Sequence, residues 1–257
     1  MAENTKLPLL SPRQYMIQAL GEFGYLLWQV GASLRYAWRD RRRVLYQLDH
    51  VGVNSIPLVL LIGLFAGAIV AWQAAYQFKG MVSLSVLGGQ VVRVMMMEMA
   101  PVLTALVIAG RIGASMTAEI GTMKVTEQID ALRTMSIDPV RYLVMPRFVG
   151  LSVMMPILTF FSILIAVLGA WLVSSYFLDL TVRTFFQSVR DFFALSDLLG
   201  GLIKSAFFGM LISLLGCYQG LHTQGGARGV GKATIDAFVL SAIAILIGDF
   251  LLWIILF

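Results

Sequence analysis

Long stretches without a charged side chain dominate this sequence and limit what it can fold into. Residues 51–78 and residues 148–178 contain no Asp, Glu, Lys or Arg. A helix needs roughly 20 apolar residues to cross the hydrocarbon core of a bilayer, so each stretch is long enough for one crossing. Of the 257 residues, 59% are hydrophobic and 13% are charged. Because a soluble domain of this length cannot bury so much apolar surface, the sequence predicts an all-α membrane protein.

Three further membrane spans are predicted although each of them contains charge. They cover residues 84–115 with Arg93, Glu98 and Arg111, residues 198–221 with Lys204, and residues 233–257 with Asp236 and Asp249. Charged side chains inside a membrane pair with one another or line a polar path, because each costs on the order of 3 kcal/mol in lipid. The prediction is therefore one domain over residues 1–257, with a five-span membrane core at residues 51–257.

The segment before the first span predicts a helix that lies on the membrane surface. Apolar residues recur there in alternating steps of four and three, which places them on one helical face. They are Met16, Leu20, Phe23, Leu27, Val30, Leu34 and Ala37. Basic residues at 39 and 41–43 follow, so an interfacial amphipathic helix is expected over residues 14–43, after a loose tail at residues 1–13. The alternative is a helix that packs on the protein's own spans, and both can hold together.

The distribution of basic residues predicts the orientation of the chain. Cytoplasmic loops of membrane proteins carry an excess of Lys and Arg. The basic segments are residues 39–43, the loop after span two with Lys124, Arg133, Arg141 and Arg147, and the loop after span four with Arg228 and Lys232. Five spans place all three on one side, so we expect a cytoplasmic N-terminus and a C-terminus on the opposite side. We attribute the net charge of +5 to these cytoplasmic basic residues and not to a surface that binds nucleic acid.

The loop after span two, within residues 111–147, predicts a short helix outside the bilayer. Thr126 is a candidate N-cap, Glu127 and Asp130 fall in the first turns, and Asp138-Pro139 ends the helix. Ile129 and Leu132 then share a face and form a narrow apolar ridge. Such a ridge can insert into a groove on a partner, and the alternative is an ordinary connecting loop.

Several stretches in this region resemble the signature of MlaE-type permeases, the membrane subunits of ABC lipid transporters linked to MCE-domain proteins. The matching stretches are AGRIGAS at 109–115, AEIGTM at 118–123, TEQIDAL at 126–132, and Asp138-Pro139 with Pro146-Arg147. The resemblance covers most of the chain after about residue 44 and includes the glycine-rich segment 225–234.

This resemblance implies partners and a substrate that composition and periodicity do not reveal. It implies a homodimer in the bacterial inner membrane, a cytoplasmic ABC ATPase dimer, a periplasmic MCE-domain protein and a STAS-domain protein. Phospholipid would move between the inner membrane and the MCE partner, in maintenance of outer-membrane lipid asymmetry. The segment 119–132 would be the coupling helix that contacts the ATPase. Its expected contact residues are Glu119, Gly121, Thr126, Glu127, Gln128, Ile129, Asp130 and Leu132.

Energy would come from that separate ATPase, which would bind ATP and magnesium. Residues 226–233, GARGVGKA, nearly match a nucleotide-binding P-loop, but Ala233 replaces the hydroxyl residue and an apolar helix precedes the segment. His50 and His222 have no acid or nucleophile companions in the sequence. We therefore expect no catalytic residues, no metal site and no enzymatic activity in this chain.

The acids within the spans leave a second function open. Glu98, with Arg93, is a candidate for the lining of a lipid cavity, or it pairs with Arg93 or Lys204 only to neutralise its charge. Lys204 is expected to extend toward the membrane surface. The alternative function is a proton-coupled secondary transporter that uses Glu98 or Asp249, although internal repeats typical of that class are not visible.

Overall fold

The computed structural model describes residues 12–78 and 84–256, and in this part of the chain every regular element is helical. The α-helices are α1 (Pro12–Ser33), α2 (Arg41–Gly52), α3 (Ile56–Phe78), α4 (Leu87–Val94), α5 (Ala100–Ile108), α6 (Ala114–Val125), α7 (Gln128–Thr134), α8 (Met145–Phe177), α9 (Val182–Phe192), α10 (Leu195–Leu221) and α11 (Gly226–Leu256). Short 3-10 segments are η1 (Leu34–Tyr36), η2 (Val53–Ser55) and η3 (Leu84–Val86), and π-helical segments are η4 (Met95–Met99), η5 (Ala109–Gly113) and η6 (Val140–Val144).

Among the described residues, five helices are long and apolar enough to cross a membrane, which confirms the predicted all-α class with five spans. They cover Arg41–Gln77, Leu87–Val125, Val140–Phe177, Leu195–Leu221 and Gly226–Leu256. Most extend beyond the predicted spans, because helical hydrogen bonding continues into the polar residues at their ends. The basic residues 41–43 therefore begin the first spanning helix and do not end an interfacial helix over 14–43. The predicted tail at residues 1–13 lies almost wholly outside the described residues.

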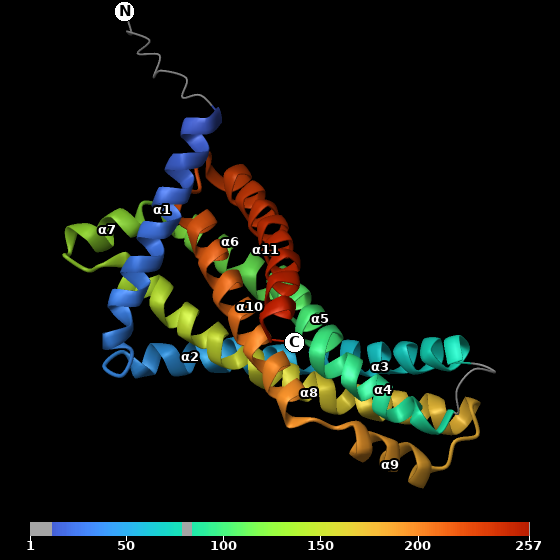
Figure 1. The fold of residues 1–257 in the computed structure, drawn as a ribbon. Helices are drawn as coiled ribbons and strands as arrows, with labels where there is room; N and C mark the ends of the chain where they lie inside the picture. Colours follow the sequence, from blue (N-terminus) through green and yellow to red (C-terminus); the bar gives the residue numbers. More distant parts are fainter. Residues whose placement is uncertain (1–11, 79–83, 257) are drawn as a thin grey trace, which may run out of the picture.

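Helix α1 packs on the chain's own spans and also presents apolar side chains outward. Figure 1 shows it running crosswise to α2 and α3. Its buried residues include Leu26 and Val30, which join a cluster with residues of η6 and α10. Leu27 and Leu34 of the predicted stripe are instead 43% and 41% exposed. The buried face is thus rotated slightly from the predicted one, because contacts with η6 and α10 determine it.

Glycines bring α3 and α8 into backbone contact. A Cβ atom built on Gly67 would lie 2.0 Å from the carbonyl oxygen of Ala166, and one on Gly169 would lie 2.1 Å from that of Leu64. A Cβ atom on Gly63, one turn before Gly67, would lie 2.7 Å from the carbonyl oxygen of Ser162. The small-xxx-small pattern of Gly63 and Gly67 therefore closes α3 onto α8 within one chain.

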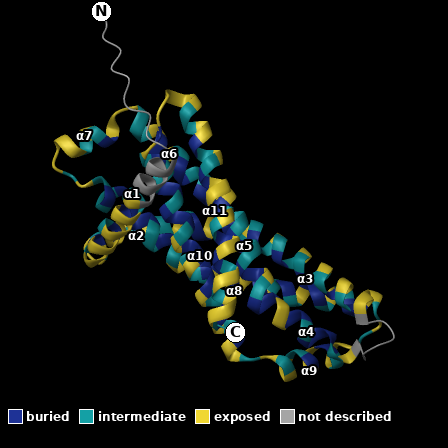
Figure 2. Cartoon of the chain, turned by 45° about the horizontal axis from the view of Figure 1, so that its top comes forward, coloured by how far each residue is buried: buried dark blue, intermediate teal, exposed yellow. Residues whose placement is uncertain are grey.

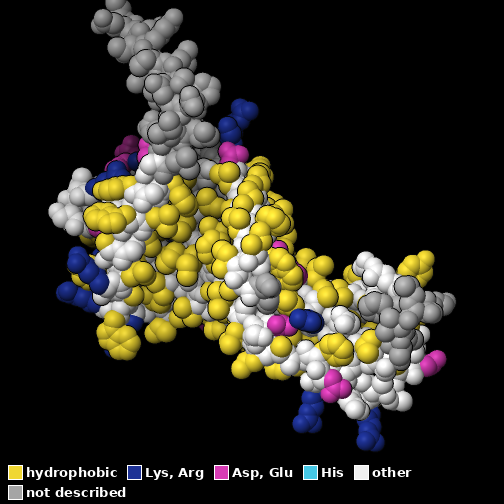
Figure 3. Space-filling view, viewed as in Figure 1, with side chains coloured by type: hydrophobic (Ala, Val, Ile, Leu, Met, Phe, Trp, Pro, Cys, Tyr) yellow, Lys and Arg dark blue, Asp and Glu magenta, His cyan; other side chains and the backbone are white. Residues whose placement is uncertain are grey.

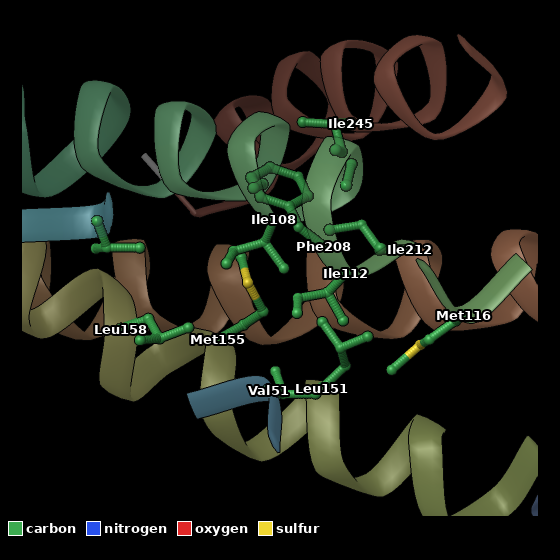
Figure 4. Packing of buried hydrophobic residues seen from close by; sticks show 13 residues of the cluster. Val51, Ile108, Ile112, Met116, Leu151, Met155, Leu158, Phe208, Ile212 and Ile245 are labelled. Atoms are coloured by element: carbon green, nitrogen blue, oxygen red, sulfur yellow. The ribbon is translucent and has the colours of Figure 1, made fainter. Parts of the chain in front are cut away.

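The centre of the molecule is an apolar cluster shared by all five spans. Figure 4 shows Met155 of α8, Ile108 of α5 and Phe208 of α10 packed together, with Ile245 of α11 beside them. Helix α2 contributes Val51, which is fully buried. This cluster joins the spans on which the charged residues described below are carried.

The outer surface of the spans is also apolar. Figure 2 shows exposed residues along the outer faces of α11 and α3, and Figure 3 shows hydrophobic side chains covering the middle of one face while Lys and Arg gather mainly toward its ends. On α11 the exposed large residues include Ile235, Ile247, Phe250 and Ile254. This distribution is that of an integral membrane protein, whose apolar zone contacts lipid.

The substitution Gly67→Ala is expected to destabilise the protein, because the added methyl group meets the backbone of α8, which cannot move aside locally. Overpacking of this kind costs about 1–3 kcal/mol. The measurement is the thermal unfolding midpoint of the detergent-purified protein. Gly31→Ala is the matched control, since a Cβ atom there meets nothing within 4 Å. Equal midpoints for the two variants would contradict the close α3–α8 contact.

Candidate functional site

Lys204 of α10 is the centre of a buried charge cluster that joins three spans. Its side chain is fully buried, and its Nζ atom lies 2.9 Å from Glu98 Oε1 and 2.7 Å from Asp249 Oδ1. Glu98 belongs to η4 in the second span and Asp249 to α11. The ammonium therefore ties the second, fourth and fifth spans together inside the membrane region.

The sequence of the second span leaves a backbone carbonyl oxygen free to accept a further hydrogen bond from this lysine. Lys204 Nζ also donates to the carbonyl oxygen of Met97, at 3.2 Å. In an α-helix that carbonyl would accept from the N–H group of residue 101, but residue 101 is proline and has none. The interruption coincides with the π-helical turn η4, a feature frequent at functional sites. Met97 thus offers Lys204 an acceptor that the regular helix would have used itself.

The cluster is buried on one side and open on the other. The Lys204 side chain is 0% exposed, that of Asp249 is 18% exposed and that of Glu98 is 32% exposed. The Trp253 ring lies 5.4 Å from Lys204 Nζ. Two carboxylates facing one ammonium leave a formal charge of −1, and Glu98 is its most accessible part. The expectation that Lys204 extends toward the membrane surface is wrong, because the lysine is drawn inward between two acids.

Arg93 and Glu98, the two residues predicted to line a lipid cavity, bind different partners. Arg93 Nε lies 3.1 Å from Asp197 Oδ2, at the start of α10. The Arg93 side chain is 51% exposed and that of Asp197 is 9% exposed. Arg93 and Glu98 are five residues apart in the sequence, and they form no ion pair with each other in the structure. Their shared role in lipid binding stays a prediction.

The first two predicted coupling residues lie at the end of the second spanning helix. Glu119 is in α6, and its Oε2 atom accepts a hydrogen bond from Arg147 Nη2 of α8 at 2.8 Å. A Cβ atom on Gly121 would lie 2.9 Å from the Thr223 hydroxyl oxygen, just beyond α10. Glu119 therefore ties this end of the second span to the third span, and Gly121 lies close to the residues that follow the fourth span.

Helix α7 begins after a sharp reversal of the chain and is not capped by Thr126. The Thr126 hydroxyl donates to the carbonyl oxygen of Thr122 at 2.8 Å and accepts from Gln128 Nε2 at 3.0 Å. Glu127 adopts a left-handed backbone conformation with φ of 61° between α6 and α7. Thr126 fails as a cap because it still belongs to the last turn of α6.

The predicted apolar ridge on α7 is used within the chain. Ile129 is fully buried and joins the cluster that contains Leu26 of α1 and Cys217 of α10, and Leu132 packs against it. The expectation that this ridge inserts into a partner is therefore wrong for Ile129, since the protein's own core already fills that position. Among the described residues, Asp130 pairs with Lys124 at 3.2 Å and with Arg133 at 3.3 Å.

What α7 does expose is mostly polar. Glu127, Gln128, Ala131 and Thr134 face outward, and Met135, just past the helix, is 62% exposed. The helix ends at Thr134, before the predicted Asp138-Pro139 stop, because Ser136 adopts a left-handed conformation with φ of 59°. A partner at this end would therefore meet a polar face on a helix whose apolar side is anchored.

The segment that resembles a P-loop has no P-loop geometry. Residues 226–233 form the first turns of α11, and helix α10 precedes them. A P-loop needs a strand, a loop and a helix, so that backbone N–H groups converge on the phosphates. Lys232 is an exposed residue in the second turn of α11.

Comparison with known proteins identifies the family. A sequence model of the family described as Permease MlaE matches residues 44–255 of this chain. The chain belongs to the MlaE permease family. Among curated relatives, a probable ABC transporter permease protein of Rickettsia typhi is 41% identical over 214 residues, which is 83% of this chain and 83% of the relative.

Two other relatives show how widely the resemblance extends. A probable ABC transporter permease protein of a Synechocystis strain is 40% identical over 228 residues, covering 89% of this chain and 87% of the relative. The chloroplastic protein TRIGALACTOSYLDIACYLGLYCEROL 1 of Arabidopsis thaliana is 34% identical over 211 residues, covering 82% of this chain and 60% of the relative. The chain is thus an ABC transporter permease of the MlaE family.

The buried charge cluster around Lys204 predicts that removal of the lysine lowers the stability of the protein. Lys204→Met is expected to destabilise the protein by about 3–5 kcal/mol, because it leaves two acids without their buried counter-ion. The triple variant Glu98→Gln, Lys204→Met, Asp249→Asn should recover most of the loss. Thermal unfolding of the purified variants measures both effects. Lys232→Met, at an exposed lysine, is the control, and a midpoint for Lys204→Met equal to that control would refute the pairing.

Proposed function

We propose that this permease moves phospholipid between the bacterial inner membrane and a periplasmic MCE-domain partner, in maintenance of outer-membrane lipid asymmetry. The observation that carries the proposal is the family match over residues 44–255, together with relatives named as ABC transporter permeases. The name of the Arabidopsis relative contains that of a galactosyl diacylglycerol, which supports a polar glycerolipid as the substrate class.

The apolar character of the spans suits such a substrate. An amphiphile needs a surface that accepts varied acyl chains, and the chain has 14 methionines, whose flexible side chains adapt to varied shapes. Glu98 is the accessible edge of an otherwise buried charge cluster in the second span. In this proposal Glu98 and Arg93 mark the polar part of the lipid path, and a homodimer completes its walls.

The proposed energy source is a cytoplasmic ABC ATPase dimer that binds ATP and magnesium and contacts α7. Two ion pairs are consistent with a coupling role for α7 and the span ends next to it. Asp130 of α7 binds Lys124 of α6, and Glu119 of α6 binds Arg147 of α8. A force applied to the exposed face of α7 would therefore reach the second and third spans directly. Under this arrangement the N-terminus is cytoplasmic, the C-terminus is periplasmic, and a STAS-domain protein is a further partner.

The proton-coupled alternative fits less well. It would use Glu98 or Asp249, and both carboxylates already have a counter-ion in the same buried lysine. The relatives named as ABC transporter permeases also favour ATP as the energy source.

Reconstitution of the permease with its ATPase tests the proposed function. We expect a fluorescent phospholipid to move only when ATP and the ATPase are both present, and to keep moving when a protonophore dissipates the proton gradient. The measurement is lipid transfer between proteoliposomes and an acceptor protein. Movement that stops with the protonophore while ATP is intact would support the alternative instead.

The exposed face of α7 predicts a specific effect on ATPase binding. The double variant Glu127→Lys, Gln128→Lys is expected to reduce co-purification of the ATPase by about tenfold or more, since charge changes at an interface cost several kcal/mol when like charges meet. Thermal stability should stay unchanged, because both side chains are exposed.

The matched control is Arg183→Glu, Arg190→Glu on α9, which Figure 1 places at the opposite end of the molecule from α7. That variant should bind the ATPase normally. Equal co-purification of wild type and the α7 variant would remove α7 from the interface.

A further inference from the structure

The corner between α1 and α2 concentrates basic side chains at the start of the first span. Arg35, Arg39, Arg41 and Arg42 are all exposed there. Figure 3 shows Lys and Arg side chains gathered on the flank of the molecule near this corner, beside hydrophobic side chains. Arg41 begins the first spanning helix, ten residues before the uncharged run that starts at residue 51, so the group lies at the polar end of that span.

The nearest acid in this corner is already neutralised. Asp40 accepts a hydrogen bond from Arg141 Nε at 2.9 Å and a longer one from Arg43 Nη1 at 3.4 Å. Both arginines also lie over tyrosine rings, Arg141 over Tyr36 at 4.2 Å and Arg43 over Tyr142 at 3.9 Å. These contacts fix Asp40 and its two partners in place, and they leave the other arginines of the corner without this acid.

Three guanidinium groups of the corner have no ion-pair partner among the side chains that the structure describes. Over residues 21–77 and 85–256, whose side chains the structure describes, no carboxylate forms an ion pair with Arg39, Arg41 or Arg42. A guanidinium group presents a planar fork of N–H donors that matches two phosphate oxygens. The unpaired group is thus chemically suited to a phosphodiester.

Exposed aromatic side chains beside these arginines indicate that the phosphodiester would be part of a membrane lipid. Trp38 is 83% exposed and Tyr46 is 65% exposed, and Leu45 between the arginines and Tyr46 is 60% exposed. Trp and Tyr are enriched at the level of lipid headgroups, where one part of the ring contacts acyl chains and another contacts water. Arginines and exposed aromatic residues thus lie together at the polar end of one span.

We infer that residues 34–46 form a binding site for anionic phospholipids of the leaflet in which this corner lies. The arginines would bind the headgroup phosphate, while Trp38, Leu45 and Tyr46 contact the upper acyl chains. Phosphatidylglycerol fits better than phosphatidylcholine, because the choline ammonium would meet three unpaired guanidinium groups. The inference is independent of the proposed transport, since the site uses different residues from the charge cluster around Lys204.

Quenching by labelled lipids tests this site in the full-length protein. A fluorophore is attached to Leu45→Cys, and the only native cysteine, Cys217, is fully buried and should not react. The protein is reconstituted in phosphatidylcholine liposomes that contain a small fraction of spin-labelled phosphatidylglycerol or spin-labelled phosphatidylcholine with the same acyl chains. We expect phosphatidylglycerol to quench roughly fivefold more strongly per mole, as one basic residue contributes about that factor near a membrane surface.

Two matched variants locate the effect. Arg41→Gln, Arg42→Gln should lower the quenching ratio markedly, because two of the three unpaired guanidinium groups are lost, whereas Arg183→Gln, Arg190→Gln on α9 removes the same charge and should leave the ratio unchanged. Wild-type protein offers a check without any substitution, because the ratio must fall as salt screens the charges. Added inorganic phosphate at constant ionic strength should not compete, and competition would indicate a site for free phosphate.

Equal quenching by the two lipids would overturn the inference. A preference for phosphatidylglycerol that is not lowered by Arg41→Gln, Arg42→Gln, or that is insensitive to salt, would overturn it as well. The loss of the preference in the α9 variant would show a general effect of net charge and would count against a local site.

Discussion

The arrangement of the spans depends on one ammonium group in a place where water cannot solvate it. Lys204 is fully buried, and Glu98, Asp249 and the Met97 carbonyl oxygen replace water around its ammonium group. Each acceptor comes from the second or the fifth span, while the lysine comes from the fourth. The three helices must therefore keep their relative depth and rotation, since a shift of one turn would separate the charges. Apolar packing alone, which is not directional, would not impose that register.

The same reasoning connects the membrane region with the end that carries α7. The ion pair of Glu119 with Arg147 joins the second and third spans, and that of Lys124 with Asp130 joins the second span to α7. Ile129 fastens the apolar side of α7 in the core formed with α1 and α10. Helix α7 is thus an extension of the span bundle with an exposed polar face, and this is the face on which we propose that the ATPase binds.

Features set by local sequence were predictable, and features set by contacts between distant residues were not. The five spans and the all-α class followed from long apolar stretches, and the family followed from the motifs at residues 109–147. Lys204 was one of two partners predicted for Glu98, and the structure confirms it, whereas Asp197 as the partner of Arg93 was not predicted, because the two residues lie 104 positions apart in the sequence. The burial of Ile129 was missed for a similar reason, since periodicity shows that a helix has an apolar side but not what covers it. A lysine and two acids in three separate apolar stretches were the available signal for the cluster.

The glycine contacts between α3 and α8 have a mechanical consequence. Where Gly67 meets Ala166 and Gly169 meets Leu64, backbone touches backbone, so no side chain there can change rotamer to accommodate sliding. Rearrangement of packed helices usually proceeds through small shear steps that side chains absorb. The first and third spans are consequently expected to move as one rigid unit. Any opening or closing of a path through the protein would then take place where other helices move relative to this pair.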